Sequence, residues 1–183
     1  MFCFNTSAST PVNGDESDPV LTAREVWIGV EKAARAPHLT TAHASDSAIH
    51  WESDDKTHFK RSVTMAGGGV HVKDGEVIFQ EVRLSPPCLF EAETRGSGAR
   101  TSMIVSHEPS SNLDPDSTDI SLVIVYQLRI PGLTDEAEIA KINKDYPQLA
   151  RKVVVETLSH IRDWKKEGTL SLAEAPSGTS SPQ

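Results

Sequence analysis

The sequence has little of what defines several common classes of protein. Among 183 residues, cysteine occurs twice, aromatic residues make up 5 %, and no apolar run approaches the roughly 20 residues that a membrane-spanning helix needs. Two cysteines cannot build a disulfide framework, and neither has the Cys/His spacing typical of zinc sites. With these classes of protein excluded, we expect a single domain of ordinary size whose two cysteine thiols stay free in a reducing compartment.

Basic residues are also scarce. Lys and Arg total 18 against 26 Asp and Glu, which gives a formal net charge of −8. Binding to nucleic acid or to anionic lipid depends on clustered positive charge, and this chain has no run of it. The N-terminal residues lack the basic and apolar regions of a secretory signal. We therefore expect a cytoplasmic protein that binds no nucleic acid and spans no membrane.

The spacing of apolar residues predicts an α+β fold. A period of two predicts six strands, near 45–52, 57–66, 76–84, 88–94, 100–108 and 118–130. Alternation over residues 2–5 permits a short strand before them. The connections are short and rich in Gly, Pro and Asp, which favours an antiparallel meander.

Two segments show the helical period of 3.6. A capping box at residues 22–25 begins a helix that ends before Pro37, and one or two further turns can follow it. A longer apolar stripe over 139–164 predicts the longest helix of the chain. Pro147 lies within it and predicts a kink, or two helices that meet at 145–148.

The remaining segments are polar and rich in turn-forming residues. We expect a single domain over 1–170 that contains a flexible arm over 6–20, followed by a disordered tail over 171–183. In that domain, a curved antiparallel sheet of about seven strands wraps around the long C-terminal helix. Two short helices follow the first strand. A sheet wrapped around one helix commonly leaves a cavity between them.

This order of elements resembles the helix-grip fold of the SRPBCC superfamily, which includes START lipid-transfer domains and the birch-pollen allergen. Local strings are similar to its AtaL-like branch, found in bacteria and in fungal natural-product gene clusters. They are LTAREVW at 21–27, FKRSVT at 59–64, FQEVRL at 79–84 before Pro86-Pro87, and EGTL at 167–170. The chain departs from the family at Ser62, where an acidic residue is expected. The resemblance implies a hydrophobic ligand cavity and no particular reaction.

Polar residues on the apolar faces of the predicted elements are the candidates for a site. Each costs about 1–3 kcal/mol if it is buried without a partner, so it bonds a neighbour, water or a ligand. The candidate catalytic residues are Arg61 and Tyr126, and the candidate ligand-binding residues are Phe59, Gln80, Met103, His107, Tyr146, Val153 and Thr157. Structural alternatives stay open: an arginine can pair with a carboxylate or reach solvent, and a tyrosine can simply pack in the core.

No spacing of His, Cys, Asp or Glu predicts a metal site, and no phosphate-binding loop or nucleophile elbow is present in the sequence. We therefore expect neither a metal nor another cofactor. The leading hypothesis is a cofactor-independent cyclase or isomerase, including a pericyclase such as an intramolecular Diels–Alderase, that acts on a natural-product intermediate. Such chemistry needs orientation and a few hydrogen-bond donors.

Two other functions fit the same residues. One is a non-catalytic binder or carrier of a hydrophobic small molecule, which would release its ligand unchanged. The other is a protein-interaction module whose cavity is filled by its own side chains, and a void below roughly 300 Å³ would favour it. In each case we expect a monomer or weak dimer.

Overall fold

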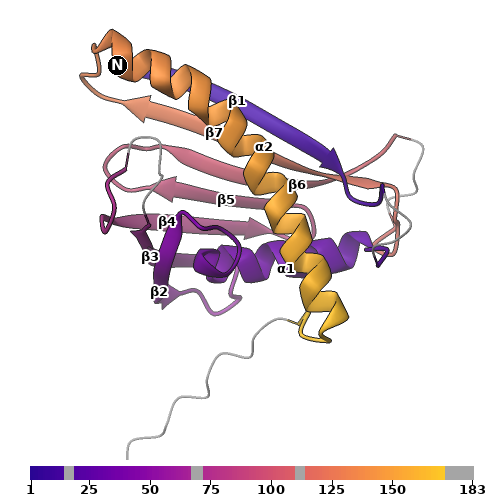
Figure 1. Cartoon of the computed structure of the whole chain (residues 1–183). Coiled ribbons are helices and arrows are strands. Elements are labelled where there is room, and N and C mark those ends of the chain that lie inside the picture. Colours follow the sequence, from indigo (N-terminus) through magenta and orange to yellow (C-terminus); the bar gives the residue numbers. More distant parts are fainter. Residues whose placement is uncertain (15–18, 67–71, 110–113, 172–183) are drawn as a thin grey trace, which may run out of the picture.

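The computed structural model describes residues 1–14, 19–66, 72–109 and 114–171 (Figure 1). Its strands form one antiparallel sheet of seven in the order β1-β7-β6-β5-β4-β3-β2. The strands are β1 (Phe2–Pro11), β2 (Ala44–Glu52), β3 (His58–Met65), β4 (Val77–Ser85), β5 (Leu89–Thr94), β6 (Arg100–His107) and β7 (Ile120–Ile130). The six strands expected between 45 and 131 are all present, and the α+β helix-grip arrangement is confirmed.

β1 is longer than expected. It pairs with β7 along its whole length, from Phe2 opposite Ile130 to Pro11 opposite Ser121. Residues 6–11, which we expected to belong to a flexible arm, are therefore strand. Their side chains are small and polar, which hides the pattern, but the ladder uses backbone groups that every residue other than proline supplies in full. Residues 15–18 and the expected tail from 172 lie outside the described residues.

Two helical elements follow β1, as expected. Helix α1 (Ala23–Arg35) begins with the predicted capping box: the Thr22 hydroxyl accepts from the Glu25 amide, and the Glu25 carboxylate accepts from the Thr22 amide. The second element, η1 (Pro37–Leu39), is a single 3₁₀ turn.

The last helix, α2 (Glu136–Lys166), is continuous through Pro147. The alternative prediction, that two helices meet at 145–148, is therefore wrong. One missing amide removes one hydrogen bond, whereas the apolar stripe of α2 packs against the sheet on both sides of that position. Figure 1 shows α2 running obliquely across one face of the sheet, with α1 beside its C-terminal half. In the part of the chain that the structure describes, no helix is long and apolar enough to cross a bilayer.

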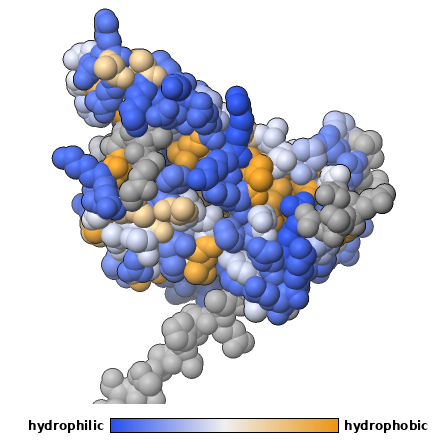
Figure 2. Space-filling model, in the orientation of Figure 1, coloured by the Kyte–Doolittle hydropathy of each residue, from blue (hydrophilic) through white to orange (hydrophobic). Residues whose placement is uncertain are grey.

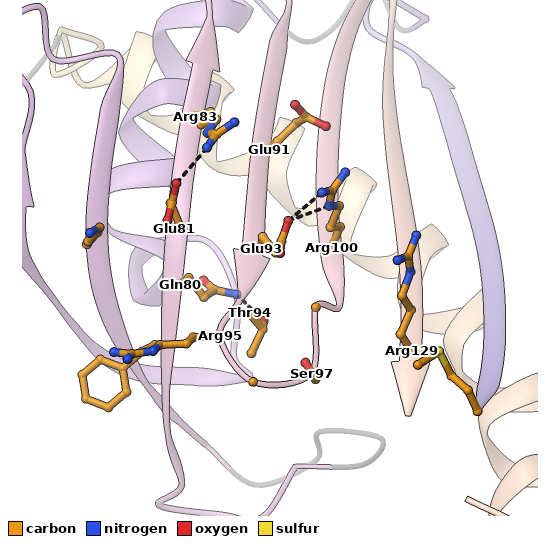
Figure 3. A pocket seen from close by; sticks show the side chains of 15 residues that line it. Gln80, Glu81, Arg83, Glu91, Glu93, Thr94, Arg95, Ser97, Arg100 and Arg129 are labelled. Carbon is orange, nitrogen blue, oxygen red and sulfur yellow. Dashed lines mark hydrogen bonds and ion pairs between the residues drawn. The ribbon is translucent and has the colours of Figure 1, made fainter. Parts of the chain in front are cut away.

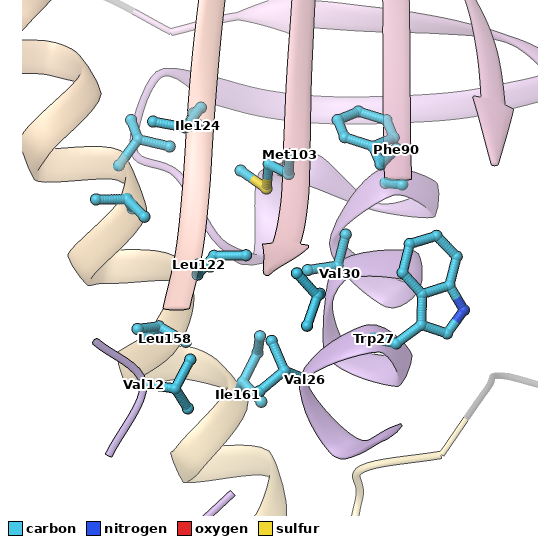
Figure 4. Packing of buried hydrophobic residues seen from close by; sticks show 14 of the residues in the cluster. Val12, Val26, Trp27, Val30, Phe90, Met103, Leu122, Ile124, Leu158 and Ile161 are labelled. Atoms are coloured by element: carbon cyan, nitrogen blue, oxygen red, sulfur yellow. The ribbon is translucent and has the colours of Figure 1, made fainter. Parts of the chain in front are cut away.

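The core fills one end of the space between sheet and helices. Val26 and Val30 of α1 pack with Leu158 and Ile161 of α2 and with β7 (Figure 4). The helices touch closely at Gly29, where an added Cβ would lie 2.4 Å from Ile161 Cγ1. A smaller cluster of Leu128, Ile142 and Tyr146 occupies the opposite end of α2. Residues of both clusters line the cavity described next.

Candidate functional site

A cavity of about 210 Å³ lies between the sheet and α2. Its floor comes from the inner faces of β3 to β7, its roof from α2, and one wall from the end of α1, η1 and the segment before β2. The volume is below the roughly 300 Å³ at which small-molecule sites commonly begin. A compact ligand fits it, and a larger one needs the lining side chains to move. Figure 2 shows hydrophilic residues over much of the outer surface and hydrophobic residues in separate patches.

The structure brings most of the predicted site residues together. Seven of them line the cavity: Arg61, Gln80, Met103, Tyr126, Tyr146, Val153 and Thr157. They come from β3, β4, β6, β7 and α2, which are far apart in the sequence. Their assembly supports the face assignments made from alternation.

Two predicted site residues lie outside the cavity. Phe59 is fully buried in the hydrophobic core, and the Arg35 guanidinium lies 5.1 Å from its ring centre. His107 is the last residue of β6 and pairs with Ile120 at the start of β7. Both side chains share a strand face with residues that do line the cavity. Alternation identifies the face of a strand but not how far along it a cavity extends, so these two assignments are wrong as lining residues.

Arg61 is the most unusual group in the cavity. Its side chain is buried, and the residue is only 5 % exposed. Nε and Nη2 donate to Gln80 Oε1 at 3.0 and 2.8 Å, Nη1 donates to the Ala34 carbonyl, and the guanidinium lies 5.8 Å from the Phe90 ring centre. Among the described residues, no carboxylate lies within ion-pair distance. Arg61 therefore neither pairs with a carboxylate there nor reaches solvent.

This burial has an electrostatic consequence. Loss of hydration disfavours the charged guanidinium and lowers the pKa of Arg61 to about 9. The group is still predominantly a cation at neutral pH. The cavity thus holds a positive charge that is solvated by neutral oxygens alone.

A short row of polar side chains crosses the cavity floor. Arg61 on β3 lies opposite Gln80 on β4, which lies opposite Thr94 on β5. The Gln80 amide nitrogen donates to Thr94 Oγ1 at 3.3 Å, a contact seen in Figure 3. Because that nitrogen faces Thr94, the amide oxygen faces Arg61, and the orientation of Gln80 is determined by its neighbours.

The two tyrosines of the chain meet at the other side of the cavity. The ring centres of Tyr126 (β7) and Tyr146 (α2) lie 5.6 Å apart at 74°, an edge-to-face contact. Burial raises the pKa of both hydroxyls, and the neighbouring Tyr126 raises that of Tyr146 further. Both are therefore protonated at neutral pH and can donate a hydrogen bond.

The sequence reasoning missed several polar lining residues. Thr94 and Thr101 lie on the inner faces of their strands, in phase with Ala92 and Met103, so alternation could have found them. His43 lies between η1 and β2, where no periodic signal exists. Both of its ring nitrogens are buried without a partner among the described residues, and so is the Thr157 hydroxyl. These unpartnered groups make the lining more polar than the sequence suggested.

A larger depression, about 860 Å³, lies on the opposite face of the sheet (Figure 3). Its charged side chains form ion pairs: Arg83 with Glu81 at 2.9 Å along β4, and Arg100 on β6 with Glu93 on β5 at 2.7 Å. Such pairs are typical of a solvated sheet face. Gln80, Thr94, Ser97 and Arg100 line both this depression and the inner cavity. In the described residues, no group of three or more His, Cys, Asp or Glu is placed to hold a metal ion.

Comparison with known proteins identifies a family that matches this chain. Residues 6–168 match AtaL, a family described as acetylaranotin biosynthesis cluster protein L. The protein of that name from Aspergillus terreus is 32 % identical over 173 residues, which cover 92 % of this chain and 94 % of the relative.

Solved structures share the fold at much lower sequence identity. The Zhui aromatase/cyclase from Streptomyces sp. R1128 superposes with a TM-score of 0.61 at 10 % identity, covering 90 % of this chain and 96 % of that one. The di-domain aromatase/cyclase BexL has a TM-score of 0.53 at 13 % identity, covering 88 % of this chain and 49 % of BexL. These similarities establish the helix-grip architecture.

Proposed function

Because the chain belongs to the AtaL family of biosynthesis-cluster proteins, we propose that it is a cofactor-independent cyclase or isomerase that acts on a natural-product intermediate bound in the cavity. The relative's place in a biosynthesis cluster supports a role in secondary metabolism. Two proteins with the same fold are aromatase/cyclases, which is consistent with ring formation. The observation that carries the proposal is the buried Arg61 guanidinium in an otherwise largely apolar cavity.

The first contribution of the cavity to catalysis would be to orient the bound intermediate. A flexible intermediate enclosed by Val63, Met103, Leu149 and Val153 would lose most of its rotational freedom on binding. Holding two reacting centres in a productive geometry can remove up to about 7–11 kcal/mol from a barrier. Neither a nucleophile nor a bound cofactor is needed for that contribution.

Arg61 and Tyr126 supply the second contribution. Both are hydrogen-bond donors at neutral pH, and both face the space in which the substrate would lie. As a substrate carbonyl gains negative charge during ring closure or a double-bond shift, the N–H and O–H groups stabilise it more strongly than in the ground state. One such donor is commonly worth about 2.7–4 kcal/mol. A pericyclic closure, in which bonding electrons rearrange around a ring without net proton transfer, suits a site equipped with donors.

The experiment is a product assay with purified protein and intermediates of the surrounding biosynthetic pathway. Product should form faster with the protein than without it, and Arg61→Met and Tyr126→Phe should each lower that rate by about tenfold or more. Arg83→Met, on the outer face of the sheet, is the matched control and should leave the rate unchanged. Equal rates with and without protein would exclude catalysis of those intermediates.

The alternative is a non-catalytic carrier, and one observation favours it: the described lining contains no carboxylate or thiol that could act as base or nucleophile. In that case, an intermediate would bind with measurable affinity and be recovered chemically unchanged. The interaction-module alternative remains as well, because 210 Å³ lies below the size expected of a ligand site. Absence of binding by any intermediate would support it.

A further inference from the structure

We infer that the ligand of this cavity carries an acidic group, a carboxylic acid or a comparably acidic enol, and binds as the anion against Arg61. The inference rests on the proposed function in that the same cavity receives the ligand, but it does not require turnover. It defines the ligand class as a compact apolar body with one ionised oxygen group.

Arg61 and Arg35 both lie at the C-terminal end of α1, but their partners differ in charge. Arg35 makes ion pairs with Glu31, at 3.2 Å, and with Glu52. Arg61 is more deeply buried, and its hydrogen-bond acceptors among the described residues are two neutral oxygens, the Ala34 carbonyl and the Gln80 amide oxygen. A buried charge ordinarily has a counter-ion, because neutral groups compensate lost hydration only in part. The counter-ion is therefore the part of the site that the described residues do not supply.

The charge of the whole lining also favours an anion. The described lining contains two arginines, Arg61 and Arg100, and no Asp or Glu. The Arg100 guanidinium is paired with Glu93 on the outer face of the sheet, so its charge is already compensated there. The chain as a whole is acidic, with 26 Asp and Glu against 18 Lys and Arg. An anion inside the cavity would consequently meet attraction from Arg61 and no carboxylate of the described lining, although the chain as a whole is negative.

Arg61 also has hydrogen-bond donors that its neighbours leave unused. A guanidinium carries five N–H groups. Gln80 Oε1 uses one on Nε and one on Nη2, and the Ala34 carbonyl uses one on Nη1. One N–H therefore remains on each terminal nitrogen. A carboxylate, with two oxygens on one carbon, can accept from both, as can the adjacent oxygens of an acidic enol and its carbonyl.

Burial also lowers the pKa of Arg61 to about 9, which reports how unfavourable the lone charge is in the free protein. An anion at hydrogen-bond distance would favour the charged form and reverse this shift. Binding of an acid would then be coupled to relief of an electrostatic penalty that a neutral ligand of the same shape leaves in place.

The test compares two compounds of nearly the same shape, 2-naphthoic acid and 2-naphthamide, by isothermal titration calorimetry at pH 7. The acid is ionised at this pH and the amide is neutral. We expect the wild-type protein to bind the acid at least about tenfold more tightly. In Arg61→Met, this preference should fall to about one, because the acid loses affinity and the amide does not. Arg83→Met removes an equal charge from the outer face and should keep the preference.

A second variant covers the possibility that Arg61→Met does not fold. Gln80→Glu places a carboxylate beside an intact Arg61 and should abolish the preference for the acid while leaving amide binding within about threefold. Equal binding of both compounds by the wild type, a preference that survives in both variants, or no binding of either compound at millimolar concentration would overturn the inference. Acid-selective binding without turnover of any intermediate would overturn the proposed enzyme and leave this inference standing. Turnover of neutral intermediates without acid selectivity would support the proposed enzyme and overturn the inference of an acidic ligand.

Discussion

Arg61 and Gln80 face each other across β3 and β4, and one amide oxygen of Gln80 accepts hydrogen bonds from both Nε and Nη2 of Arg61. A neutral group thus occupies the place beside a buried cation where proteins commonly have a carboxylate. Gln and Glu have nearly the same shape, so replacing one NH2 group by an oxygen would convert a hydrogen-bonded pair into an ion pair. Substitution of Gln80 is therefore the most direct way to change the charge of the cavity.

Gln80→Glu should raise the free energy of unfolding by about 1–2 kcal/mol, because the hydrogen bonds to Arg61 become charge-assisted. The contact with Thr94 is kept, since the threonine hydroxyl can donate to the new carboxylate. Urea unfolding at pH 7 measures the change. Gln80→Met is the matched control and should lower stability by about 1–3 kcal/mol, because Arg61 then loses its main acceptor. A Glu variant less stable than wild type would contradict this account.

The tyrosines should titrate abnormally, and they can be observed without interference because the chain has only two. Burial raises the pKa of Tyr126 and Tyr146 above the ordinary value near 10. In the folded protein, the ultraviolet absorbance of tyrosinate should therefore stay low through pH 11, whereas in urea it should rise around pH 10. A folded-state transition near pH 10 that accounts for both residues would show that the hydroxyls are accessible to water.

The same shift makes stability depend on pH. The folded state retains tyrosine protons that the unfolded chain releases above about pH 10, so the unfolded state binds fewer protons there. This contribution is fully present below pH 10 and is lost as the pH rises further. Tyr126→Phe should flatten the fall of the unfolding free energy between pH 10 and 11.5. The comparison between variants is essential because Arg61, whose pKa is lowered, acts in the opposite sense over part of this range.

Thr157→Val should stabilise the protein by about 1 kcal/mol. The Thr157 side chain on α2 is fully buried, and its hydroxyl has no partner among the described residues. Valine has nearly the same shape and removes the unsatisfied group, whereas Thr157→Ser keeps the hydroxyl and loses a methyl, so the serine variant should be less stable than wild type. Urea unfolding shows whether each variant raises or lowers the free energy of unfolding. If valine lowers stability, the hydroxyl must be bonded in solution.

Gly29→Ala should destabilise the contact between α1 and α2. A Cβ at this position would lie within 3 Å of three side-chain atoms of Ile161, which is fully buried and has little room to move. We expect a loss of about 1–3 kcal/mol. Gly14→Ala is the control, since nothing lies within 4 Å of a Cβ there. Combining Gly29→Ala with Ile161→Ala should cost less than the sum of the two single changes.

Much of the site was predictable because the ladder between β3 and β4 is regular. Without a bulge, the alternation that assigns Arg61 and Gln80 to the inner face carries through the strands. The same holds for Tyr126, whose strand pairs with both neighbours without a register shift. Register shifts do occur in β2, where no site residue was predicted.

The other features of the fold and the site could not be predicted from the sequence. Some lie where no periodic pattern exists, and others depend on how far along a strand the residue lies. His43 lies in an irregular segment, so nothing in its neighbourhood predicts where its ring points. His107 is on the inner face of β6 but at the end remote from the cavity. Residues 6–11 carry small polar side chains in a strand whose stability comes from pairing with β7, a contact that no local pattern reveals.

The pairing of β1 with β7 also bears on how the chain is made. Phe2 emerges early from the ribosome, and its partner Ile130 is added only after most of the chain has been synthesised. Until then, β1 has no strand to pair with, and the sheet edge that it will occupy does not exist. Long-range pairing of this kind slows folding, because the closure of a long loop precedes any gain from contacts. The sheet is therefore complete only when β7 has been made and has paired with β1, and the cavity cannot close before β7 and α2 have followed.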